Sequence, residues 1–139
     1  MRRIVEFTVH GRPVPQGSSR AFVPKGWTRP VITSANKSLK PWRKEISETA
    51  AFEMNGREMF SKGVPVRATL TFYFRKPSGV KKAQQFKTTA PDLDKLTRAF
   101  LDGLTGIVFH DDGQVAEVRA SKMFDDNERV EARIEQIEE

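Results

Sequence analysis

The sequence predicts a single α/β (α+β) domain in which two main helices pack on a mixed or mainly antiparallel sheet. The chain has 139 residues, of which 37% are hydrophobic, and this suits one domain with a modest core over residues 1–139. Two segments repeat apolar residues at steps of three and four, as helices do, and four segments alternate apolar and polar residues, as strands do. Their order along the chain indicates one sheet with helices packed on it.

Four segments have the alternation of strands. They are residues 3–10, 66–74, 114–123 and 128–137. We expect the last two to form a hairpin, because only the turn residues 125–127 separate them. A shorter hairpin is expected over residues 24–34, after an exposed loop over residues 11–19 that holds two Pro and two Gly. Trp27 in this hairpin either packs on the core or stacks on an unpaired base.

Two segments have the period of amphipathic helices. The apolar face of the first consists of Leu39, Trp42, Ile46, Ala50 and Met54. Pro41 suits a first helical turn, so we expect this helix to start at 38–40 and to stop at Asn55-Gly56. The second helix is expected over residues 94–104, with an apolar face that consists of Leu93, Leu96, Phe100 and Leu104. Asp92 and Asp94 lie where it starts.

The composition excludes several classes of protein. There are no cysteines, which removes disulfides and thiolate metal sites. No apolar run approaches the roughly 18 residues of a membrane span, and no signal-peptide core follows Met1, so we expect a cytoplasmic protein with no membrane partner.

The net charge of +6 is unevenly distributed along the chain. Residues 7–44 hold eight Lys or Arg and no acid, and residues 59–91 hold seven and no acid, whereas residues 92–139 hold thirteen acids against six bases. Basic walls beside an acidic segment suit a nuclease, because the walls attract the polyanion while a metal bridges carboxylates to phosphate. The alternative, that the charge serves only solubility, explains the total but not the acid-free runs.

The acidic segment concentrates two carboxylate pairs, Asp92/Asp94 and Asp111/Asp112, around the second helix. That helix rises roughly 16 Å at 1.5 Å per residue. The run over residues 105–111, if extended, spans roughly 23 Å. We therefore expect Asp92, Asp94 and one acid of the second pair to converge, with Mg²⁺ or Mn²⁺ as the neutralising ion.

A purely structural interpretation of these acids stays open. Asp92 is then a helix N-cap, and Asp94 complements the helix dipole. Asp111 and Asp112 form a turn with Gly113. In this interpretation the chain is a nucleic-acid-binding module without catalytic activity.

The spacing of the acids resembles that of a known family. P-D-L-D, an apolar helix with an internal Asp102, D-D-x-Q-V and a strand ending at Lys122 resemble the RusA family of Holliday-junction resolvases over about 34 residues. These are small, dimeric, Mg²⁺-dependent endonucleases of phages and bacterial prophages. The resemblance implies that Asp92, Asp94 and Asp112 bind metal, that Asp111 supports them, and that Lys122 lies near the active site among the catalytic residues; otherwise Lys122 is one more surface lysine.

The chain departs from the family pattern at two positions. Asn usually follows the second Asp, and Lys follows four residues after it; this chain has Lys95 and Arg98 there. Arg98 can clamp a phosphate and stabilise charge, but it cannot transfer a proton near neutral pH. If the family's Lys is an electrostatic aid, Arg98 substitutes for it; if that Lys transfers a proton, the resemblance fails at this position.

The expected partner is branched DNA, with the four-way junction first and a flap or replication fork as the alternative. Residues 76–90 have little apolar periodicity and are expected to form a mobile arm that grips DNA. The expected DNA contacts are Arg20, Lys76, Lys81, Lys82, Lys87 and Lys95. Two symmetric nicks need two sites, so we expect a two-fold homodimer, held by surplus apolar surface on the first helix and on strand 66–74.

Overall fold

The computed structural model describes residues 3–17, 19–22, 25–26, 31–34 and 37–139. Its elements are β1 (Ile4–His10), β2 (Ser19–Phe22), β3 (Val31–Ser34), α1 (Leu39–Met54), β4 (Val66–Phe74), α2 (Leu93–Leu104), the short 3₁₀ helix η1 (Asp112–Gln114), β5 (Val115–Phe124) and β6 (Arg129–Gln136). Both helices lie within one or two residues of the bounds that their apolar periods predict, and Asn55 ends α1 in the left-handed conformation at φ 46°.

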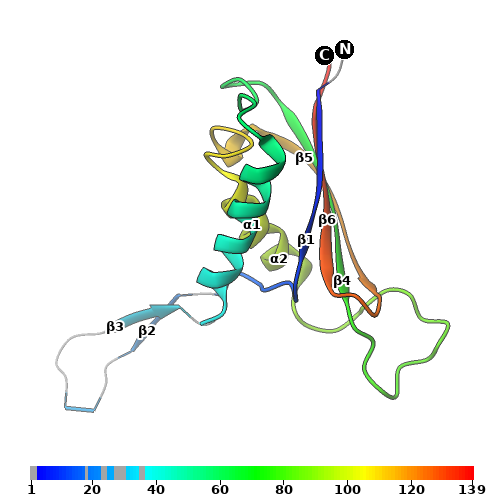
Figure 1. Cartoon of the computed structure of the whole chain (residues 1–139). Helices are drawn as coiled ribbons and strands as arrows, with labels where there is room; N and C mark the ends of the chain where they lie inside the picture. The colour runs from blue at the N-terminus through cyan, green and yellow to red at the C-terminus, as the bar shows by residue number, and fades with distance from the viewer. Residues whose placement is uncertain (1–2, 18, 23–24, 27–30, 35–36) are drawn as a thin grey trace.

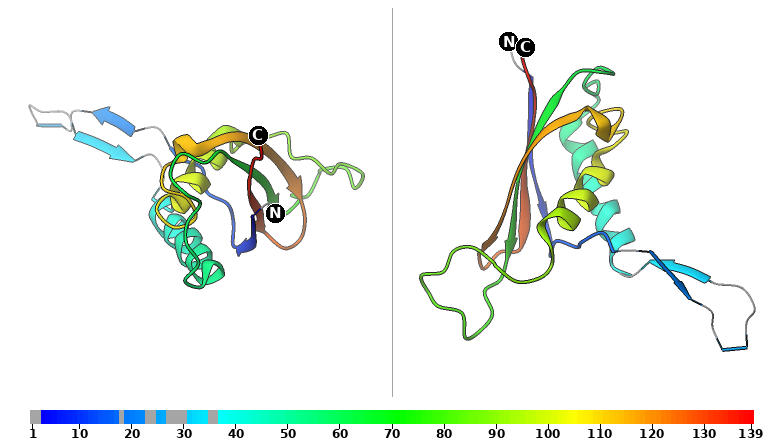
Figure 2. Two further views of the ribbon diagram at one scale, coloured as in Figure 1. Left: turned by 90° about the horizontal axis from the view of Figure 1, so that it is seen from above. Right: turned by 180° about the vertical axis from the view of Figure 1, so that it is seen from behind.

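Four strands form a mixed sheet in the order β1-β6-β4-β5. The β1/β6 and β6/β4 pairs are antiparallel, whereas β4 and β5 are parallel. Figure 1 shows α1 and α2 together on one face of this sheet, so the predicted α+β class is confirmed. Among the described residues, no helix lies on the opposite face, as the views in Figure 2 also show.

The core lies between the helices and the sheet. Every second residue of β4 from Val66 to Phe74 is buried, and Phe100 of α2 meets Phe72 edge to face with ring centroids 6.2 Å apart. The helices approach closely at Gly103, where an added Cβ would stand 2.8 Å from Cγ2 of Ile46. Ser47 Oγ also donates to the Gly103 carbonyl oxygen at 2.8 Å. This contact fixes α2, and with it the acidic segment, against α1.

The predicted hairpin of the last two strands is wrong, because β4 lies between β5 and β6. The connection crosses the end of β4, where the Asp125 N–H donates to the Phe74 carbonyl oxygen at 2.9 Å. The physical reason is burial: β4 has the most consistently buried apolar face, and a central place in the sheet keeps that face under the helices (Figure 1) and away from the rim that water reaches. Closeness in sequence does not outweigh that gain.

The run over residues 105–111 is also not extended as predicted. It folds into a turn in which Gly106 N–H donates to the Phe109 carbonyl oxygen at 2.8 Å and Val108 N–H donates to the Leu104 carbonyl oxygen at 3.0 Å. Val108 and Phe109 are fully buried, so this run fills the core instead of returning along α2. Asp111 and Asp112 consequently stay near the C-terminal end of the helix.

A hairpin is present, but the predicted bounds of 24–34 are confirmed only for its second strand, because the first strand, Ser19–Phe22, lies before them. Figure 1 shows β2 and β3 extending away from the sheet and helices. Trp27 lies outside the described residues, and no side chain of β2 or β3 is described.

The segment 76–90 projects as a loop beyond the end of the sheet (Figure 1), but its returning half is tied to β5. Phe86 forms an antiparallel bridge with Met123. Lys87 N–H donates to the Lys122 carbonyl oxygen at 3.0 Å, and Phe124 N–H donates to the Gln85 carbonyl oxygen at 2.9 Å. We call residues 76–90 the arm; its mobility stays a prediction.

The apolar surplus predicted for dimer formation is not found on the elements named for it. The apolar face of β4 and the stripe of α1 are buried. In the described ranges, the exposed large apolar side chains are Phe52, Phe86 and Val118. Only Phe52 belongs to α1, and it lies off the predicted stripe.

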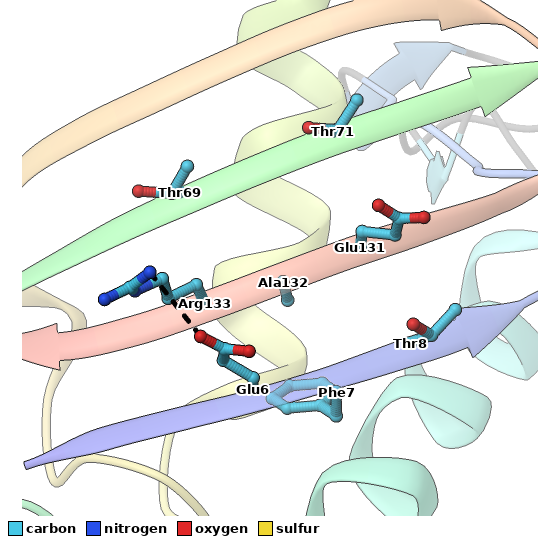
Figure 3. Close-up of a pocket in the computed structure, with 8 residues that line it drawn as sticks. All are labelled: Glu6, Phe7, Thr8, Thr69, Thr71, Glu131, Ala132 and Arg133. Carbon is cyan, nitrogen blue, oxygen red and sulfur yellow. Dashed lines mark ion pairs between the residues drawn. The ribbon is translucent and has the colours of Figure 1, made fainter.

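The open face of the sheet is polar. Figure 3 shows a shallow hollow there, of about 440 Å³, across β1, β6 and β4, in which Arg133 faces Glu6. Their nitrogen and oxygen lie 3.5 Å apart, and Arg67 pairs with Glu117 at 2.7 Å and with Glu135 at 3.3 Å on the same face. Each of these side chains has a partner of opposite charge on the face, so the face does not provide the expected acidic site. Among the described helices, none has the length and apolarity of a membrane span.

Candidate active site

A cavity of about 690 Å³ lies between α2 and the edge strand β5. The helix contributes Asp94, Arg98 and Asp102, which are four residues apart and therefore share one face. Asp112 of η1 also lines the cavity, and the apolar part of its wall consists of Leu93, Leu101, Val115, Val118 and Ala120. One groove therefore holds three acids and a guanidinium.

Asp92 occupies the N-cap position of α2, but its carboxylate does not cap the helix. Its backbone is extended, at φ −70° and ψ 137°, and its side chain makes no hydrogen bond to the first turn. The nearest cation is Lys95, 3.8 Å away, and both side chains are largely exposed. The capping role of the structural interpretation is thus not realised at Asp92, although Asp92 itself is not among the residues that line the cavity.

Asp94 and Arg98 are exposed on successive turns of α2. Asp94 lies in the first turn, where the helix dipole favours a carboxylate. Within the part of the chain that the structure describes, neither side chain has a hydrogen bond or an ion pair. Both groups are therefore available to a ligand in the cavity.

The two members of the second acidic pair differ: Asp111 caps the turn, and Asp112 interacts with the carboxylate of Asp111. Asp111 Oδ1 accepts from Gly113 N–H at 2.9 Å, which caps η1 and lowers the pKa of Asp111. Interaction with the Asp111 carboxylate raises the pKa of Asp112, and partial burial and the charge of Asp102 act in the same direction. The turn of the structural interpretation is therefore real for Asp111, while Asp112 is crowded by like charges.

Gln114 explains why this turn holds its shape. The side chain is buried, with 8% of its surface exposed. Its Oε1 accepts from His110 N–H at 2.9 Å and Asp111 N–H at 3.2 Å, and its Nε2 donates to the carbonyl oxygens of Ser61 at 2.8 Å and Val64 at 3.0 Å. All four hydrogen-bonding positions of the amide are used. Gln114 thus fastens the acidic turn to the loop before β4.

Asp102 is a site residue that the sequence reasoning noted but did not assign to the site. It lines the cavity and accepts from Arg43 of α1 at 3.2 Å. The same Arg43 side chain donates to Gln16 Oε1, and Gln16 N–H donates to the Lys95 carbonyl oxygen at 3.0 Å. The spacing of Asp94, Arg98 and Asp102 is the signal that identifies it.

Comparison with known proteins identifies the family. The family model described as "Endodeoxyribonuclease RusA" matches residues 10–135. The chain belongs to the RusA endodeoxyribonuclease family.

Two curated relatives agree with this membership. The chain is similar to the uncharacterized protein YqaN of Bacillus subtilis (strain 168), with 26% identity over 143 residues and 96% of each chain covered. It is also similar to the crossover junction endodeoxyribonuclease rusA of Lactococcus phage r1t, with 33% identity over 82 residues, or 58% of this chain and 62% of the phage protein. The protein is therefore a nuclease.

The acids of this RusA-family chain suit a divalent cation chemically, but they do not converge as predicted. Within the described ranges, no three acids or histidines gather closely enough to hold a metal ion. The charge of Asp102 acts on Asp112, and Asp102 lies roughly 12 Å along the helix from Asp94 at 1.5 Å per residue. The expected convergence fails because the turn over residues 105–111 keeps Asp112 at the far end of α2.

Carboxylate oxygens nevertheless form a donor set that suits Mg²⁺ or Mn²⁺. Mg²⁺ in enzymes that act on phosphates commonly uses one or two carboxylates, with water and substrate oxygens as further ligands. Asp92 and Asp94 are such a pair, two residues apart at the start of α2. The assignment of Asp92, Asp94 and Asp112 as metal ligands stays a prediction.

The lysines expected to contact DNA fall into two groups. Lys81 and Lys82 are exposed on the arm, and Lys95 is exposed on α2 beside Asp92. Lys76 Nζ instead donates to the Lys81 carbonyl oxygen at 3.0 Å and the Lys82 carbonyl oxygen at 2.9 Å. The side chain of Arg20, on β2, is not described.

Lys87 and Lys122 also have partners within the chain. Lys87 Nζ lies 5.3 Å from the Phe74 ring centroid and donates to Thr89 Oγ1 at 3.0 Å; burial, Lys122 and Arg12 lower the pKa of Lys87. Lys122 Nζ donates to the carbonyl oxygens of Thr89 at 2.7 Å and Pro91 at 2.9 Å. Lys87 and Lys122 therefore bind groups of the arm and of the chain that leads into α2.

Proposed function

We propose that this nuclease resolves four-way DNA junctions by paired symmetric nicks, in recombination and repair. The observation that carries the proposal is the groove along α2. In this groove the chain, which belongs to the RusA family, presents Asp94, Asp112 and an unpaired Arg98. The printed name of the phage relative, a crossover junction endodeoxyribonuclease, supports the junction as the substrate. We further propose that the enzyme is encoded by a phage or prophage and acts in the bacterial cytoplasm.

The proposed cofactor is Mg²⁺, with Mn²⁺ as a substitute, and the proposed ligands are Asp92, Asp94 and Asp112. Because Asp112 lies near Asp102 in the structure, this proposal requires Asp112 to approach the other two acids when metal and DNA bind. When bound, the ion supplies an activated water and stabilises the leaving 3′ oxygen. Arg98 contributes two parallel N–H donors to a phosphate in the groove and neutralises charge there, without transferring a proton.

The test is incubation with a labelled four-way junction, a flap and a plain duplex, each with and without Mg²⁺. We expect symmetric nicks in the junction, with 5′-phosphate and 3′-hydroxyl ends, only when the metal is present. Preferential cutting of the flap would favour a flap or replication-fork nuclease instead. Binding without any cleavage would favour the nucleic-acid-binding module.

The arm is proposed to contact the DNA backbone through Lys81 and Lys82. Replacing both with Gln should reduce the slope of log affinity against log salt by about 1.8, because each lost phosphate contact accounts for about 0.9. Filter binding of a junction over a range of salt concentrations measures this slope. Arg119→Gln is the control, since Arg119 is an exposed cation paired with Glu117 on β5. An equal change of the slope in both variants would mean that the arm does not contact the DNA.

A two-fold homodimer is proposed because two symmetric nicks need two sites, and one chain has one such groove in its described part. Sedimentation at micromolar concentration should give a dimer, with and without a junction. A monomer under both conditions would favour an enzyme that makes one nick.

A further inference from the structure

Lys122 lies where the arm, the edge strand and the acidic segment meet. On β5 it is in register with Phe72 of β4, so its side chain is on the face that the helices cover. Its Nζ donates to the carbonyl oxygens of Thr89 and Pro91, the second of which immediately precedes Asp92. Within the described residues it has no carboxylate at ion-pair distance. Two of its three donors are therefore used by the backbone that leads into α2.

The backbone around Lys122 makes the same connection. Its own carbonyl oxygen accepts from Lys87 N–H at 3.0 Å, and Phe86 bridges Met123 one residue further along. The chain then runs from this pairing to Asp92 without any further regular structure. The position of Asp92, and of the first turn of α2 that carries Asp94, consequently depends on how firmly residues 87–91 are held as well as on the packing of α2 against α1.

We propose that Lys122 is a positioning residue, which latches the end of the arm onto β5 and thereby fixes Asp92 and Asp94 at the start of α2. The proposal rests on the proposed function, because it assigns the acids a role in cleavage. A small displacement matters there: misplacing a reacting group by about 1 Å reduces a rate by roughly 10²-fold. The same contacts join DNA held by the arm to the acids that act on it.

The first test compares Lys122→Met with Lys122→Arg. Lys122→Met removes the donors but keeps an unbranched apolar stem. It should lower the cleavage rate of bound junction by roughly 10²-fold. Junction affinity should stay within about threefold of wild type, because the residue acts on the placement of the acids and not on DNA binding. Lys122→Arg still has donors for both carbonyls and should keep a rate within about threefold of wild type, with an unchanged pH profile. If Lys122 instead transferred a proton during cleavage, both variants would be inactive, because Arg cannot release a proton near neutral pH.

A second measurement does not depend on cleavage. Amide hydrogen exchange, measured without DNA or metal, should become faster over residues 85–96 in Lys122→Met and stay slow in Lys122→Arg. Lys81→Gln, an exposed change on the same arm, is the matched control and should leave this exchange unaltered. Unchanged exchange in Lys122→Met would overturn the proposal whatever the enzyme cleaves. If exchange is faster in Lys122→Met but the wild-type protein cuts no DNA, the latch is supported and the proposed function is overturned.

A disulfide can replace the latch. Phe86 and Met123 lie opposite each other, but the backbone hydrogen bonds on either side of them are made by their neighbours, so the two residues form a non-hydrogen-bonded pair. The Cα atoms of such a pair lie roughly 4.5 Å apart, which is within disulfide range. Because the chain has no cysteine, Phe86→Cys with Met123→Cys adds a single possible disulfide. Oxidation of this pair in the Lys122→Met background should restore at least half of the lost rate on a logarithmic scale, and reduction should remove the gain. No gain on complete oxidation, with Lys122→Arg inactive as well, would assign Lys122 to the chemistry instead.

Discussion

Asp112→Asn is expected to lower junction cleavage by roughly 10³-fold, equivalent to about 4 kcal/mol of transition-state stabilisation, while junction binding survives or strengthens. The carboxylate lines the groove and is crowded by Asp111 and Asp102, so removing its charge weakens a metal site but also reduces the repulsion of DNA. Asp92→Asn and Asp94→Asn should behave alike. Single-turnover cleavage and a binding assay without metal measure the two effects separately.

Asp111→Asn is the matched control for this series. Asn caps a helix start about as well as Asp, so the hydrogen bond from Gly113 N–H and the fold should persist. We expect a loss of roughly tenfold, at the lower end of the effect of residues that support metal ligands from outside. Full activity in all three variants at Asp92, Asp94 and Asp112 would contradict the metal site, and inactivity confined to Asp111→Asn would exchange the roles within the pair.

Gln114→Leu should cause the largest loss of stability among the changes considered. The substitution leaves the carbonyls of Ser61 and Val64 and the N–H groups of His110 and Asp111 without their partner. Each buried group left unsatisfied costs about 1–3 kcal/mol. Because His110 and Asp111 are exposed and can bind water, we expect a total of about 3 kcal/mol in the free energy of unfolding.

Equilibrium urea unfolding measures this loss, and Gln85→Leu is the control because Gln85 is an exposed glutamine. The control should stay within about 0.5 kcal/mol of wild type. Under conditions where Gln114→Leu remains folded, its cleavage should also fall, since the turn that carries Asp112 loses its anchor. Equal stability of the two variants would mean that the buried amide does not hold the turn.

The sequence predicted the elements well and their neighbours less well. The periods that located α1, α2 and β4 follow from residues within each element, such as the alternation from Val66 to Phe74. The pairing of β5 with β4 does not, because it depends on which strand has most apolar surface to cover on the helix side. The turn after Leu104 was missed for a similar reason: the distance estimate assumed an extended run over residues 105–111, whereas Val108 and Phe109 fold back and are buried in the core.

The candidate site shows the same division. The acids and Arg98 are recognisable from their spacing along one helix. Gln114 is part of the D-D-x-Q-V motif, but the sequence does not show its structural role. Its four hydrogen-bond partners come from the loop before β4 and from its own turn. The contacts of Lys122 are with carbonyl oxygens, which every residue has, so no residue type in the sequence marks them.

The strand order also bears on how the protein is made. β6 follows every other element along the chain, yet it lies inside the sheet, between β1 and β4, and it pairs with β1 from Ile4↔Glu135 to His10↔Arg129. Pairing between strands so far apart in the sequence slows folding, because the intervening chain loses conformational entropy before any contact between the strands stabilises the structure. Until residues 129–136 have left the ribosome, β1 and β4 have no common neighbour. The nascent nuclease therefore stays without a completed sheet, and without a firmly placed acidic groove, until nearly all of the chain described here has been synthesised.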